Sequence, residues 1–140
     1  MFVTVDQLDN LQRSGRVSRG KAWLASMLDV KPIFTLDQAG QVVPADRVRG
    51  REPVVARVLQ WVDRALARKP EVVRFGIAHV DAPEVAERLR SALVAAYHPR
   101  DCFVTLATGV LGTHTGIGAW GVFYQVEDGT PSRPPVGELA

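Results

Sequence analysis

Two short segments of this sequence carry the side chains best suited to bind a small anion. The first, Thr108 to Trp120, holds four of the chain's 12 glycines, places Thr113 and Thr115 on either side of His114, and has no charged side chain. Glycine allows positive φ and close approach of backbone N–H groups, so this run favours a turn that presents amides, hydroxyls and an imidazole to a carboxylate or phosphate. A tight turn into a strand, with a surface histidine, is the alternative.

The second segment is the loop that runs from Gly15 to Gly20. It places Arg16, Ser18 and Arg19 between two glycines, where backbone and guanidinium donors could converge on an anion. A solvated connection between two helices is the alternative interpretation, because charged loops commonly have no partner but water.

A third basic feature is the alternation of Arg47, Arg49 and Arg51 with small or apolar residues. In an extended segment these three side chains would face the same way and form a small basic ridge. Ordinary solvation of surface charges is the alternative.

Length and composition indicate one compact globular domain. The 140 residues are 46% hydrophobic and 23% charged, and the net charge of +2 is too small to indicate nucleic-acid binding. The single cysteine, Cys102, excludes an intramolecular disulfide and is expected to be a buried thiol. Because no apolar segment is long enough to span a membrane and no signal peptide is evident, we expect a cytoplasmic protein.

The pattern of apolar residues predicts helices, strands and a tail. Helices are predicted over residues 4–11, 21–28, 53–66 and 82–96, and strands over 33–36, 41–44, 72–80, 102–107 and 119–126. Residues 128–140 are rich in glycine and proline and are expected to form a loose tail. Together the elements predict a single-domain α/β fold with a mixed or antiparallel sheet of about five strands and helices packed on it.

Local details of four elements can also be predicted. Thr4 is expected to cap the first helix, and Asp81 with Glu84 forms a capping-box arrangement for the fourth. The strands over 72–80 and 102–107 are apolar almost throughout, which indicates strands that are covered on both faces.

Taken together, these segments resemble the C-terminal half of the DegV family, bacterial fatty-acid-binding proteins that deliver acyl chains to a fatty acid kinase. The matching segments, in family order, are residues 8–18, 29–33, 47–51, 79–83 and 112–118. The resemblance implies a DegV-like C-terminal lipid-binding domain over residues 1–127. The family's N-terminal domain has no counterpart here, so binding is expected to need that domain.

The resemblance also implies roles for individual residues. In the family a fatty acid lies in a tunnel between two α/β domains. The family histidine corresponds to His114 and the family arginine turn to Arg16, so both are expected at the carboxylate, together with Thr113, Thr115 and Gly116. Ile117 stands where the family usually has proline, and Ser14 where it has glycine.

Two further assignments complete the expected site. Arg47, Arg49 and Arg51 match a basic stretch suited to docking the kinase. The acyl-chain wall is expected to include the apolar residues Trp23, Leu24, Met27, Ile33 and Phe34.

Other classes of function are less well supported by the residues. An enzyme with His114 as general base lacks a nucleophile beside it, paired carboxylates or a Walker-type lysine, so no catalysis and no cofactor are expected. The three histidines are scattered, which predicts no metal site. A detached module that dimerises, or that pairs with a separate N-terminal domain, remains the alternative.

Overall fold

The computed structural model describes residues 1–14, 30–50 and 52–132. Within these residues six strands form one sheet in the order β3-β2-β1-β6-β4-β5. Their bounds are β1 Phe2–Thr4, β2 Val30–Leu36, β3 Val42–Arg49, β4 Val73–His79, β5 Asp101–Leu106 and β6 Trp120–Val126. Neighbouring strands are antiparallel except β4 and β5, which are parallel.

The predicted α/β fold with a mixed sheet is confirmed, but the sheet has six described strands rather than about five. The additional strand is β1, whose three residues are too few to show periodicity. Thr4 does not cap a helix: it lies in β1, and its hydroxyl donates to the Pro32 carbonyl (2.7 Å). The first helix begins later, at Asp9, because pairing of β1 with β2 and β6 keeps residues 2–4 extended.

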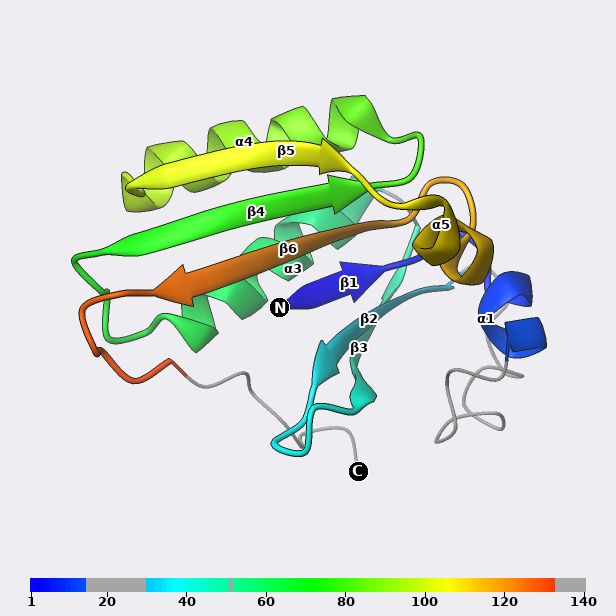
Figure 1. Cartoon of the computed structure of the whole chain (residues 1–140), viewed down its shortest axis with the longest axis horizontal. Coiled ribbons are helices and arrows are strands. Elements are labelled where there is room, and N and C mark those ends of the chain that lie inside the picture. Colours follow the sequence, from blue (N-terminus) through cyan, green and yellow to red (C-terminus); the bar gives the residue numbers. More distant parts are fainter. Residues whose placement is uncertain (15–29, 51, 133–140) are drawn as a thin grey trace.

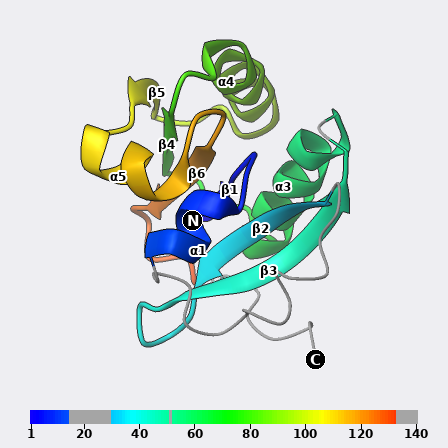
Figure 2. The same ribbon diagram turned by 90° about the vertical axis from the view of Figure 1, so that its right-hand side faces the viewer.

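The helices lie on both sides of this sheet. Their bounds are α1 Asp9–Ser14, α3 Glu52–Ala65, α4 Pro83–Tyr97 and α5 Gly109–Thr115. Figure 2 shows α3 and α4 on one side of the sheet and α1 and α5 on the other. The helix predicted over 21–28 falls outside the described residues.

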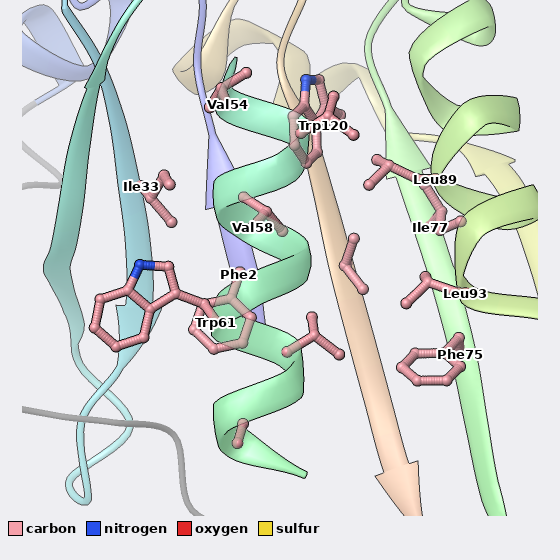
Figure 3. Packing of buried hydrophobic residues seen from close by; sticks show 14 of the residues in the cluster. Phe2, Ile33, Val54, Val58, Trp61, Phe75, Ile77, Leu89, Leu93 and Trp120 are labelled. Carbon is pink, nitrogen blue, oxygen red and sulfur yellow. The ribbon is translucent and has the colours of Figure 1, made fainter. Parts of the chain in front are cut away.

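The main core lies between the sheet and the helices α3 and α4 (Figure 3). Val58 on α3 and Leu89 on α4 are fully buried against Phe2 and Ile77 of the sheet. Each such side chain stabilises the fold by roughly 1.5–3 kcal/mol through removal of apolar surface from water. The apolar spacing that predicted both helices is therefore the spacing that packs them.

A smaller core lies under α1 on the opposite side of the sheet. It joins Phe34 of β2 to Leu11 of α1, together with Val5 and Ala119. Ile33, the neighbour of Phe34, belongs to the main core. Successive side chains of a strand point to opposite faces, so these two residues stabilise different layers.

Of the two predictions about buried strands, the one for β4 is confirmed and the one for β5 is wrong. β4 is internal and none of its residues is exposed, although α3 and α4 cover only one of its faces. β5 is an edge strand on which Phe103 is 54% exposed. An apolar strand sequence predicts that both faces are covered. It does not show whether the covering group belongs to the same chain. Cys102 accordingly is half-buried rather than fully buried.

The predicted capping box at α4 is also wrong. The N-cap residue is Ala82, which makes no side-chain cap, and Asp81 instead adopts a left-handed backbone with φ 49.

Among the described helices, none has the length and hydrophobicity that crossing a membrane requires.

Candidate functional site

The predicted anion-binding segment lies where β4 and β5 end and β6 begins, at the helix α5 (Figure 1). The sequence predicts an open turn for the glycine-rich run, but the run forms the helix α5. Thr108 caps this helix, since its hydroxyl oxygen accepts from the Leu111 N–H (3.4 Å). The N–H of Gly116 donates to the Gly112 carbonyl (2.8 Å) and is therefore committed within the protein.

Two glycines after α5 bring this helix against the N-terminal segment. Gly116 has φ 79, and an added Cβ there would lie 2.6 Å from Nδ2 of Asn10 in α1. Gly118 has φ 83, and its added Cβ would lie 2.7 Å from an Asp6 carboxylate oxygen. Asp6 is held in turn by Lys31, whose Nζ lies 3.1 Å from Oδ1. These glycines are required by the close packing of α1 on α5.

The two threonine hydroxyls of the predicted site are engaged by α5. Thr113 Oγ1 donates to the Gly109 carbonyl (2.8 Å) and Thr115 Oγ1 donates to the Leu111 carbonyl (2.9 Å). A hydroxyl that donates to its own helix retains only acceptor capacity, which does not suit a carboxylate. Direct carboxylate contacts from Thr113 and Thr115 remain predictions that need these bonds to rearrange.

His114 differs from its neighbours in having an unsatisfied polar atom. The side chain is half-buried, and its Nδ1 is shielded from solvent with no hydrogen-bond partner in the part of the chain that the structure describes. Leaving a buried polar atom unpaired costs about 1–3 kcal/mol, which favours the arrival of a further polar group. Arg16, predicted to share this role, lies outside the described residues.

The sheet face opposite α3 and α4, formed by β4, β5 and β6, is called the open face here. One row across it is Phe103, Gly76 and Phe123, and the next row, nearer α5, is Thr105, Ala78 and Gly121. Of the small residues on this face, Gly76 lies under the Phe103 ring and Gly121 under Val3, so both are buried, whereas Ala78 is partly exposed. The two phenylalanines are 54% and 37% exposed.

The rim of the open face near α5 is also apolar. Val110 and Leu111 on α5 are exposed. Ile117, which follows α5, is exposed as well, but it lies beside the first turns of α3 and α4 on the other side of the sheet. Exposed apolar residues on one face mark a ligand-binding or protein-binding surface.

The predicted acyl-chain wall is not what borders this surface. Ile33 and Phe34 are buried in the two separate cores, and Trp23, Leu24 and Met27 lie outside the described residues. The exposed apolar residues come instead from β5, β6 and α5. Alternation of large and small residues along β6 was the available signal for them, since Gly121 and Phe123 share one face.

The predicted basic stretch is located on the edge strand β3. Arg47 and Arg49 are exposed there, while Arg51 lies outside the described residues. Between them and α3, Asp46 accepts from Trp61 Nε1 (2.9 Å) and lies 3.4 Å from Arg57 Nε. The two described arginines are thus available on the surface, and kinase docking stays a prediction.

A cleft lies on the helical side of the sheet. This cleft of about 560 Å³ is bordered by the first turns of α3 and α4, and its charged lining comprises Asp6, Lys31, Asp81, Glu84 and Arg88. Lys31 is already bonded to Asp6. Carboxylates outnumber cations in this lining, so the cleft suits a fatty acid less well than the open face does.

The remaining reactive groups give little sign of catalysis. Burial raises the pKa of the Cys102 thiol, which keeps it protonated and weakly nucleophilic. In the described ranges no three His, Cys, Asp or Glu side chains converge in a way that could hold a metal ion.

Comparison with known proteins identifies similar sequences and folds. The family described as "Uncharacterised protein, DegV family" matches residues 1–127. A DegV domain-containing protein of Clostridium perfringens is 33% identical over 123 residues, which make up 88% of this chain and 42% of that protein.

Two solved structures are similar to this chain in fold. One, reported for fatty acid binding of a DegV family protein from Thermus thermophilus, has a TM-score of 0.80 and 27% identity, covering 90% of this chain and 45% of that one. The other, DegV, a fatty acid binding protein from Bacillus subtilis, has a TM-score of 0.75 and 30% identity, covering 90% and 44%. The chain spans less than half the length of these relatives.

Proposed function

The chain belongs to the DegV family, and from this membership and the geometry of the open face we propose that it binds a long-chain fatty acid. The carboxylate would lie beside His114 and the acyl chain along the open face, over Ala78 and toward the Phe103 and Phe123 rings. The observation that carries the proposal is the exposed apolar surface of β4, β5 and β6, which ends at α5 and its unsatisfied imidazole.

The acyl chain would supply most of the affinity. Each buried methylene gains about 0.8 kcal/mol, so a long chain needs an apolar groove more than it needs strong polar contacts. The open face offers such contacts through the partly exposed Ala78 and the exposed Phe103 and Phe123 rings, of which Phe103 lies over Gly76.

His114 would orient the carboxylate. A hydrogen bond between an imidazole N–H and a carboxylate is charge-assisted, and it would satisfy a nitrogen that the described residues leave unpaired. We propose Arg16 as a second contact on the strength of the family arginine turn. Thr113, Thr115 and Gly116 would then shape α5 around the head group.

A covering layer is part of the proposal. One exposed sheet face removes only one side of an acyl chain from water, and the relatives are more than twice as long as the matched region. We propose that a DegV N-terminal domain covers the open face. A fatty acid kinase would then receive the acyl group, with Arg47, Arg49 and Arg51 as its docking residues, and the chain itself would act as a carrier without catalysis.

The proposal is tested by native mass spectrometry of the purified chain, followed by solvent extraction and lipid analysis. A co-purified or added fatty acid bound near one-to-one supports the proposal, and decane of comparable apolarity serves as the control for non-specific adsorption. A chain that takes up no fatty acid, alone or with a DegV N-terminal domain added, contradicts it.

The exposed apolar residues also favour a second candidate, a module that dimerises through the open face. Phe103, Phe123 and Val110 would be covered by a second copy in that case. Light scattering after size-exclusion chromatography distinguishes the two: a lipid-free dimer that Phe103→Asp converts to a monomer favours dimerisation, and a lipid-bound monomer favours the carrier.

A further inference from the structure

We propose that the Phe103 ring, resting on Gly76, closes the far end of the acyl groove and sets the longest fatty acid that the chain accepts. This inference rests on the proposed function and adds to it the residue pair that selects chain length. It concerns the end of the groove away from α5.

The contact between the two residues comes from strand register. Gly76 of β4 and Phe103 of β5 are direct partners in the parallel ladder, so their side-chain positions share the open face. A Cβ added to Gly76 would lie 2.8 Å from Cζ of Phe103 and 3.3 Å from each Cε. The ring therefore leans from the edge strand across β4, in space that exists only because residue 76 has no side chain.

The groove has a polar limit just beyond this pair. The next row of the open face is Asp101, Arg74 and Gln125. Arg74 is ion-paired with Glu127 (2.7 Å), and an acyl terminus reaching that row would remove charged groups from water without replacing their bonds. From Ala78 to Gly76, where the ring lies, the sheet extends roughly 7 Å, at about 3.3 Å per strand residue.

Phe103 suits the role of an adjustable stop better than Phe123 does. The Phe123 ring leans along its own internal strand, with Cε2 3.3 Å from an added Cβ at Gly121. Phe103 lies on the edge strand, is more exposed, and has β4 as its single neighbouring strand. Its ring is therefore less enclosed by the protein than the Phe123 ring.

The test measures chain-length preference in the full chain, by native mass spectrometry after incubation with an equimolar series of saturated acids from decanoic to icosanoic acid. In the wild type, affinity should rise by about fourfold per added methylene and then stop rising. Phe103→Ala should extend the rise to longer acids. Gly76→Ala should stop it at shorter ones, because the added methyl lifts the ring into the groove.

The double variant and a matched control separate this role from a general structural one. Gly76→Ala combined with Phe103→Ala should behave like Phe103→Ala alone, since without the ring the methyl displaces nothing. Val94→Ala, which removes an exposed apolar side chain from α4, should leave the preference unchanged. Circular dichroism and thermal melts identify any variant that fails to fold.

The outcomes distinguish the inference from the proposed function. Wild-type binding with the same chain-length profile in Phe103→Ala overturns the inference and leaves fatty-acid binding intact. A double variant that behaves like Gly76→Ala overturns it as well. A wild-type chain that binds no acid of the series overturns both.

Discussion

Nδ1 of His79 accepts a hydrogen bond from the backbone N–H of Ala82 (3.1 Å). This buried imidazole therefore satisfies the backbone N–H of the residue at the start of α4. His79 is 6% exposed at the end of β4. The bond joins the strand to the helix that covers it, and it fixes the turn in which Asp81 adopts a left-handed backbone.

Replacing His79 should therefore destabilise the protein more than replacing Asp81. His79→Ala removes a buried acceptor and leaves a cavity, and we expect a loss of about 2–4 kcal/mol in the free energy of unfolding, measured in urea. Asp81→Asn should change the free energy of unfolding by less than about 0.5 kcal/mol, because asparagine tolerates the same backbone conformation. Equal losses would instead support a capping role for Asp81.

Gly116→Ala should be costly for two reasons that a control can separate. Gly40 has φ 75 and open space around it, so Gly40→Ala carries only the backbone penalty, roughly 1 kcal/mol. Gly116→Ala adds a clash with Asn10 and should cost about 2–3 kcal/mol in total. Adding Asn10→Ala should recover part of the difference, and no recovery would show that the clash is unimportant.

Asp128 should make stability depend on pH in the acid range. Hydrogen bonds from the Thr130 hydroxyl and N–H, and from the N–H groups of Val72 and Glu71, lower the pKa of this carboxyl from 3.8 to about 2. Since the folded pKa is depressed, the stabilisation is present above the unfolded pKa and is lost as the pH falls from about 4 to about 2.

Urea titrations of wild type and Asp128→Asn across that range measure this effect. The difference in midpoint should be largest near neutral pH and should shrink as the pH falls through the window. A difference that stays constant with pH would show that the charge of Asp128 contributes nothing. The same bonds mean that residue 128, placed at the start of a loose tail by composition, is tied to the two residues before β4.

His114→Ala should weaken fatty-acid binding through the head group alone. Loss of one charge-assisted hydrogen bond corresponds to about a tenfold weaker Kd for the acid. The matching fatty alcohol, which has no carboxylate, should bind both proteins equally in calorimetry. Val94→Ala, on the exposed side of α4, serves as the control and should change neither affinity. An equal loss for acid and alcohol in His114→Ala would remove His114 from the carboxylate.

The sequence by itself determined the elements that neighbouring residues specify. The helical spacing of Val54, Val58 and Val62 defines the buried side of α3, and Pro83 marks the first turn of α4. The strand pattern of β6 alternates as predicted. Such elements can be predicted because the interactions that form them lie within about one helical turn or one strand pair.

Only the tertiary structure decided how the ends of these elements meet and what remains uncovered. β1 exists because β2 and β6 pair with it, and α4 is capped by His79 because the strand before it delivers an imidazole to that turn. The open face is the largest feature that only the tertiary structure decided. The apolar residues of β5 predicted burial, and the fold exposed Phe103, because a hydrophobic strand needs a cover but its sequence does not say from where that cover comes.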